Sequence, residues 1–130
     1  MTNSTNTIRK LSVVLIAAGV FLHIYTAITR GKEGEPLLAT AFVLWLSLPY
    51  FVAFCIHRLL KKYFIAIGCS GAALTFDVYI HLNAFYWSQS TGTLMVLATS
   101  PILNLVFYSP IGMFIAWLLS RLLFHRKNAA

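Results

Sequence analysis

The sequence contains four long apolar stretches that are almost free of charge, with charged residues gathered in short segments between them. These stretches are residues 11–29, 37–56, 63–82 and 94–119. A membrane-spanning helix needs about 20 mostly apolar residues. Soluble domains carry about 25% charged residues, whereas this chain of 130 residues has 10% and is 59% hydrophobic. The sequence therefore predicts an all-α integral membrane protein, with one transmembrane domain over residues 1–130 and one span per stretch.

Lys and Arg residues lie mostly on one side of the predicted membrane. Two precede the first span, three lie in the connection 57–62 and three follow the fourth span, while the loop 30–36 holds two and the loop 83–93 none. Cytoplasmic segments carry the excess of positive charge in membrane proteins. Because the loops are short, this distribution predicts an up-down-up-down four-helix bundle with both the N and C termini cytoplasmic. We expect a multi-pass protein of the cell inner membrane.

The net charge of +7 does not indicate nucleic-acid binding. A nucleic-acid-binding domain carries its Lys and Arg as a patch on a soluble fold. Here these residues flank apolar stretches, where they suit contact with anionic lipid headgroups, so the lipid bilayer is the first expected partner. Cys55 and Cys69 both lie inside apolar stretches towards the predicted cytoplasmic side, and we interpret them as free thiols.

Three prolines interrupt the predicted spans. Pro49 lies within the second span and should kink it, with Ser47 available to satisfy the freed backbone groups. Pro101 and Pro110 interrupt the fourth span, which is longer than a bilayer requires. We expect a tilt or a kink there.

Small and polar residues recur at alternating three- and four-residue spacing along each span, which places them on one helix face. These polar seams are Ser12, Ile16, Gly19, His23 and Thr26 on the first span, Ala66, Ser70, Ala73, Asp77 and His81 on the third, Thr93, Leu97, Ser100 and Asn104 on the fourth and, more weakly, Thr40, Leu44 and Ser47 on the second. Small and hydrogen-bonding side chains mark the faces on which helices touch in lipid. The polar seams are therefore predicted to pack together, and Gly68 and Gly71 to allow close helix contact.

Asp77 is the only acidic residue within a span, and a charge at bilayer depth costs several kcal/mol unless it is paired, hydrated or protonated. His81 lies one turn further on the same face, within reach of an i,i+4 contact. His23 lies at a depth similar to that of Asp77, roughly 7–10 Å below the predicted outer surface at helical rise. Ser100 and Asn104 lie slightly deeper on the fourth span. We therefore predict that His23, Asp77, His81, Ser100 and Asn104 converge as a candidate binding site.

Four interpretations of this cluster remain open. The first is a hydrogen-bonded clasp that fixes helix register, and the second is an outward pocket for a proton, a cation or a small polar ligand. The third is a metal site of two histidines and one carboxylate, which offers only three ligands. The fourth is a haem site formed by His23 and His81, for which the sequence shows no shaped pocket. The sequence contains no catalytic motif and no cofactor-binding loop, so we expect no catalytic residue, no metal and no cofactor.

Asp77, the run Ser88-Gln89-Ser90-Thr91 and the run Pro101-Ile102-Leu103-Asn104 resemble a pattern in small uncharacterised bacterial inner-membrane proteins with four helices. The resemblance covers roughly the second half of the chain, with a one-residue shift between the Ser-Thr pair and the proline. The resemblance implies a four-helix bundle and implies nothing about activity.

These observations favour a non-enzymatic membrane protein that binds another membrane component. The component could be a partner subunit. It could also be a toxin that attacks the inner membrane, which this chain would bind in the manner of small immunity proteins. The first alternative is a small transporter or channel that works as a homo-oligomer, with Asp77 as the coupling carboxylate. The second alternative is a membrane enzyme, or a metal or haem protein, that uses His23, Asp77 and His81.

Overall fold

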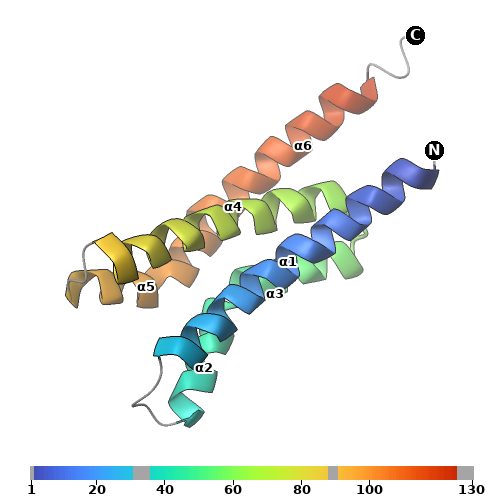
Figure 1. The fold of residues 1–130 in the computed structure, drawn as a ribbon. Coiled ribbons are helices and arrows are strands. Elements are labelled where there is room, and N and C mark those ends of the chain that lie inside the picture. Colours follow the sequence, from blue (N-terminus) through green and yellow to red (C-terminus); the bar gives the residue numbers. More distant parts are fainter. Residues whose placement is uncertain (1, 31–35, 88–90, 126–130) are drawn as a thin grey trace.

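The computed structural model describes residues 2–30, 36–87 and 91–125, and within these ranges the chain is helical apart from short connections at 47 and 59–62. The elements in chain order are α1 (Thr2–Arg30), α2 (Pro36–Leu46), α3 (Leu48–Arg58), α4 (Tyr63–Leu82), η1 (Asn83–Trp87), α5 (Thr91–Leu103), η2 (Asn104–Tyr108) and α6 (Ser109–His125). The elements η1 and η2 are short π-helices. Figure 1 shows α4 running between α1 and α6, both of which it contacts.

Three of the described helical segments are long and apolar enough to cross a membrane: Thr5–Thr29, Tyr63–Tyr86 and Met95–Leu123. A fourth candidate is the pair Ala39–Leu46 and Leu48–Arg58, which passes the same test if the two bent halves form one span. Large apolar side chains cover the outside of these helices, among them Phe21 on α1 and Phe114 on α6. The helical fold and this composition support the prediction of a membrane protein.

The predicted kink in the second span is a break between α2 and α3 with a bend of 50°. Pro49 lacks a backbone N–H, and its ring disfavours the regular helix in the preceding turn. The break at Ser47 places Pro49 in the first turn of α3, where the missing N–H needs no partner within the helix. The expected role of the Ser47 side chain is wrong, because its Oγ is buried without a hydrogen-bond partner. The backbone carbonyl of Ser47 instead accepts hydrogen bonds from the N–H groups of Tyr50 at 3.1 Å and Phe51 at 3.0 Å.

The fourth predicted span continues as one helical path through both of its prolines. The π-helical turn η2 lies between Pro101 and Pro110, and the Ser109 N–H donates to the Asn104 carbonyl five residues earlier. Such a turn accommodates one extra residue, and it changes the direction in which the side chains of the flanking turns point. The wide turn ends directly before Pro110, where an α-helical hydrogen bond cannot form.

The helices α4 and α6 pack so closely that their backbones are in contact. A Cβ atom added at Gly68 would collide with the carbonyl oxygen of Gly112, and one added at Gly112 would collide with that of Gly68. Two glycines therefore allow the two backbones to touch, as predicted for Gly68. The same prediction is wrong for Gly71, because its Cβ would meet only Leu15 Cδ1, at 4.0 Å.

The polar seams of α1 and α4 are the faces on which these helices are buried. All five residues of the α4 seam are buried, and on α1 the residues Ser12, Gly19 and His23 are buried while Ile16 and Thr26 are half-buried. In the fourth predicted span Leu97, Ser100 and Asn104 are buried, and the side chain of Thr93 lies outside the described residues. Cys55 and Cys69 are free thiols.

The seam predicted for the second span is wrong. Thr40 and Leu44 are exposed, and the buried face instead comprises Leu46, Pro49, Tyr50, Ala53 and His57. The break at Ser47 changes the directions in which the side chains of α3 point relative to those of α2. A single helical repeat extended through both helices therefore cannot identify the contact face.

Candidate functional site

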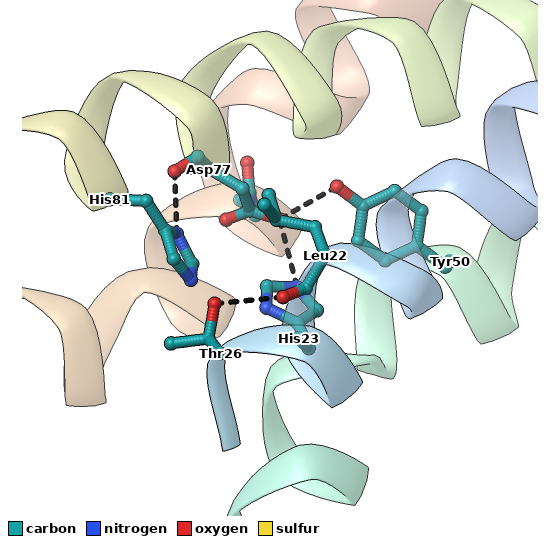
Figure 2. A network of polar contacts seen from close by, with 7 residues as sticks. Leu22, His23, Thr26, Tyr50, Asp77 and His81 are labelled. Atoms are coloured by element: carbon teal, nitrogen blue, oxygen red, sulfur yellow. Dashed lines mark hydrogen bonds and ion pairs between the residues drawn. The ribbon is translucent and has the colours of Figure 1, made fainter. Parts of the chain in front are cut away.

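The carboxylate of Asp77 lies at the centre of a buried polar network, and Asp77 is only 1% exposed. Tyr50 Oη donates a hydrogen bond to Asp77 Oδ2 at 2.7 Å, and Asn104 Nδ2 donates to Oδ1 at 2.8 Å. His23 Nε2 lies 3.2 Å from Oδ2. Each contact comes from a different helical segment, namely α3, η2 and α1, so one side chain on α4 joins four parts of the chain. Figure 2 shows the contacts of Tyr50 and His23 with Asp77.

His23 approaches Asp77 closely enough for an ion pair when its imidazole is protonated. Neither of its ring nitrogens has a hydrogen-bond partner, so the 3.2 Å contact is electrostatic and lacks hydrogen-bond geometry. The His23 ring lies between two other rings, with centroid separations of 5.7 Å to Tyr50 and 5.5 Å to His81. His23 therefore connects the Asp77 carboxylate to His81.

Local sequence features bring Tyr50 and Asn104 to the carboxylate. Tyr50 lies in the first turn of α3, directly after Pro49, and its ring packs against Gly19 so closely that any side chain at that position would collide with it. Asn104 is the first residue of the π-helical turn η2. A glycine on α1, a proline break and a widened turn thus act together to position the two hydrogen-bond donors.

His81 contacts Asp77 through the backbone. Its Nδ1 lies 2.7 Å from the Asp77 carbonyl oxygen, four residues earlier on α4. A carbonyl oxygen only accepts, so Nδ1 carries the hydrogen and donates it, and Nε2 of the neutral ring is left as an acceptor. His81 is 6% exposed and its Nε2 is buried without a hydrogen-bond partner. In Figure 2 the ring extends towards Thr26 of α1.

The structure therefore joins four of the five predicted site residues, His23, Asp77, His81 and Asn104, by direct contacts. The fifth, Ser100, is buried one turn before Asn104, and its Oγ has no hydrogen-bond partner. In the described part of the chain, no three His, Cys, Asp or Glu side chains are grouped so that they could hold a metal ion.

The sequence reasoning missed Tyr50, which makes the shortest contact with the Asp77 carboxylate. A buried tyrosine hydroxyl needs a polar partner, and Tyr50 is 0% exposed. Its signal in the sequence is the spacing of Tyr50, Ala53 and His57, a helical repeat that begins after the break at Ser47. His57 was also missed, and its Nδ1 lies 3.0 Å from Ser12 Oγ in a second buried contact.

A groove of about 290 Å³ adjoins the polar network on the side of α1, α4 and η1. The lining residues are Leu22, Tyr25, Thr26, Thr29, Val78, His81, Leu82, Phe85 and Tyr86. His81 lines this groove and also makes a polar side-chain contact with the Asp77 backbone. The groove and the polar network therefore adjoin one another at His81.

In comparisons with known proteins, no protein family, curated protein sequence or solved structure matches this chain.

Proposed function

We propose that this chain is a non-enzymatic membrane protein that works by binding another membrane component in the groove beside His81. The observation that carries this proposal is the unpartnered His81 Nε2, which belongs to a side chain that is 6% exposed and lines the groove. Buried polar groups are almost always hydrogen-bonded. Among the unpartnered buried side-chain atoms in the described part of the chain, His81 Nε2 is the one that belongs to a groove-lining residue, so it is the atom that a ligand in the groove is proposed to satisfy.

The proposed arrangement in the membrane is a four-helix, up-down-up-down bundle in the inner membrane with both termini cytoplasmic. The distribution of Lys and Arg supports this orientation. It places the groove in the outer half of the bundle, because Thr29 and Tyr86 lie at the ends of their spans that face away from the basic connection 57–62. A partner subunit or a membrane-attacking toxin would approach it from the lipid or from outside.

The Asp77 network is the rigid base of this site. Three polar side chains from three other helical segments contact one carboxylate, which suits a clasp that fixes helix register. A fixed base matters for recognition, because a preorganised site loses less conformational entropy when the ligand binds. In this proposal the Asp77 clasp holds the helices in place, and the groove formed between them binds the ligand.

The experiment is site-specific photo-crosslinking in intact cells. A photoreactive phenylalanine analogue replaces Tyr86 at the groove or, as the control, Phe51 on the lipid-exposed side of α3. We expect one defined adduct at position 86 that disappears with His81→Phe, and heterogeneous lipid labelling at position 51. Equal and heterogeneous labelling at both positions, unchanged by His81→Phe, would overturn the proposal.

A transporter or channel that uses Asp77 as its coupling carboxylate is a second candidate, favoured by the break between α2 and α3. Broken helices form ion and substrate sites in many transporters, and here Tyr50 beside the break donates to Asp77. Four short helices barely enclose a path, so this function requires a homo-oligomer. It predicts proton or cation flux in proteoliposomes that Asp77→Asn abolishes, and equal flux for both proteins would contradict it.

A further inference from the structure

Three of the residues that line the groove carry hydrogen-bond acceptors on their side chains. His81 donates its Nδ1 hydrogen to the Asp77 carbonyl at 2.7 Å, which leaves Nε2 as the lone-pair nitrogen. This nitrogen is buried without a partner. A ligand that reaches it must therefore supply a hydrogen.

The two threonines of the groove are also left as hydrogen-bond acceptors. Thr26 Oγ1 donates its hydrogen to the Leu22 carbonyl at 2.8 Å, and Thr29 Oγ1 donates to the Tyr25 carbonyl at 2.9 Å. A hydroxyl that has given its one hydrogen to the backbone offers only lone pairs to anything else. In Figure 2 the His81 ring and the Thr26 hydroxyl face one another across the space between α4 and α1. A ligand that lies between His81 and Thr26 must therefore donate hydrogens to bond with their acceptor atoms.

The remaining lining is apolar and aromatic. Leu22, Val78, Leu82 and Phe85 supply apolar surface, while the residues Tyr25 and Tyr86 are 57% and 70% exposed. Aromatic faces attract cations. None of the lining residues that the structure describes is a lysine or an arginine, so a cationic ligand meets no like charge among them.

We propose that the groove binds the primary ammonium headgroup of an aminophospholipid such as phosphatidylethanolamine, an inference that rests on the proposed function and names its ligand. An ammonium group has three N–H donors and no acceptor, which matches the three acceptors His81 Nε2, Thr26 Oγ1 and Thr29 Oγ1. The volume of about 290 Å³ suits a headgroup while the acyl chains stay in the bilayer. A choline headgroup keeps the charge but has no donor, and a glycerol headgroup has donors but no positive charge.

The test is a titration of the purified full chain with a series of lipids, read by native mass spectrometry. The series runs from phosphatidylethanolamine through its N-methyl and N,N-dimethyl derivatives to phosphatidylcholine, so donors are removed one at a time while the headgroup stays zwitterionic. Phosphatidylglycerol and free ethanolamine complete the set. We expect saturable binding of one phosphatidylethanolamine that weakens along the series by about tenfold or more in total. Free ethanolamine should compete weakly, because it lacks the acyl chains.

Two variants assign the binding to the groove. Thr26→Val removes one acceptor together with its backbone hydrogen bond, and should weaken phosphatidylethanolamine binding severalfold. Thr75→Val is the matched control, because Thr75 Oγ1 also donates to a carbonyl four residues earlier, that of Gly71, on an exposed face outside the groove. This pairing keeps the test valid even if His81→Phe fails to fold.

Equal binding of phosphatidylcholine would overturn the requirement for donors, and equal binding of phosphatidylglycerol would overturn the requirement for a cation. Equal effects of Thr26→Val and Thr75→Val would overturn the groove as the site. A His81-dependent photo-adduct with a polypeptide in place of a lipid would also overturn this inference, while the proposed function would stand. Absence of any His81-dependent adduct would overturn both.

Discussion

The hydroxyl of Tyr50 donates a hydrogen bond of 2.7 Å to the carboxylate of Asp77, joining the first turn of α3 to the C-terminal half of α4. This contact and the 2.8 Å hydrogen bond from Asn104 give each carboxylate oxygen a donor. A carboxylate in a bilayer is tolerated when such partners replace its hydration. The packing of α1, α3 and η2 against α4 therefore depends on the same side chain.

Asp77→Asn should be tolerated better than Asp77→Leu. The amide oxygen still accepts one hydrogen bond at this position, whereas leucine leaves Tyr50 Oη and Asn104 Nδ2 buried without partners, at about 1–3 kcal/mol for each group. Thermal unfolding in detergent should show the leucine variant melting clearly below the asparagine variant. Equal melting temperatures would mean that Asp77 does not act as a clasp.

Gly19→Ala should destabilise the protein through Tyr50 alone. The added methyl group collides with the Tyr50 ring, and overpacking of this kind costs about 1–3 kcal/mol. The same substitution in a Tyr50→Ala background should be neutral, so a double-mutant cycle in detergent should give a coupling energy close to the whole cost. Additive effects of the two substitutions would show that Gly19 is needed for another reason.

Gly112→Ala should separate α4 from α6, at a cost of about 1–3 kcal/mol, because the new methyl group meets the Gly68 carbonyl and the Ala72 side chain. Gly71→Ala is the control on α4. It enters open space and should be neutral or stabilising by about 0.5–1 kcal/mol, since alanine favours helix over glycine. Melting curves of the two variants measure the difference, and destabilisation by Gly71→Ala equal to that by Gly112→Ala would contradict the crossing described above.

Single cysteines should distinguish the groove from the packed network. In a background without Cys55 and Cys69, Thr26→Cys lines the groove and should react with a membrane-impermeant thiol reagent added to intact cells. Ser100→Cys should stay protected, because Ser100 is only 1% exposed and lies outside the groove. Tyr86→Cys, on an exposed position, is the positive control. Labelling of Ser100→Cys would show that water reaches the network by another route.

Reporter fusions test the proposed orientation. Fusions after residue 130 and within 57–62 should report cytoplasm, and fusions within 30–36 and 83–93 should report the outside, because positively charged segments are retained inside. An external C terminus would be incompatible with four spans and a cytoplasmic N terminus. This measurement also decides whether the bent pair α2 and α3 crosses the membrane as one span.

Much of the candidate site could be predicted because it depends on local periodicity. The seams of α1 and α4 repeat without interruption, so a regular helix brings His23, Asp77 and His81 onto buried faces whatever the loops do. The cost of an unpaired carboxylate in lipid then requires polar partners near Asp77. Neither argument needs information about how far apart the helices lie.

The sequence by itself determined the helical, membrane-spanning character of the chain and the residues most in need of partners, because hydropathy and helical repeat are properties of short segments. Tertiary structure decided which atoms meet. The 50° bend at Ser47 brings Tyr50 to Asp77 and moves the buried face of α3 away from the repeat of α2. It also decided that His81 bonds to the backbone of Asp77, that its Nε2 is buried without a partner and that the residue lines the groove. These outcomes depend on distances and angles between helices, which a pattern along one helix does not contain.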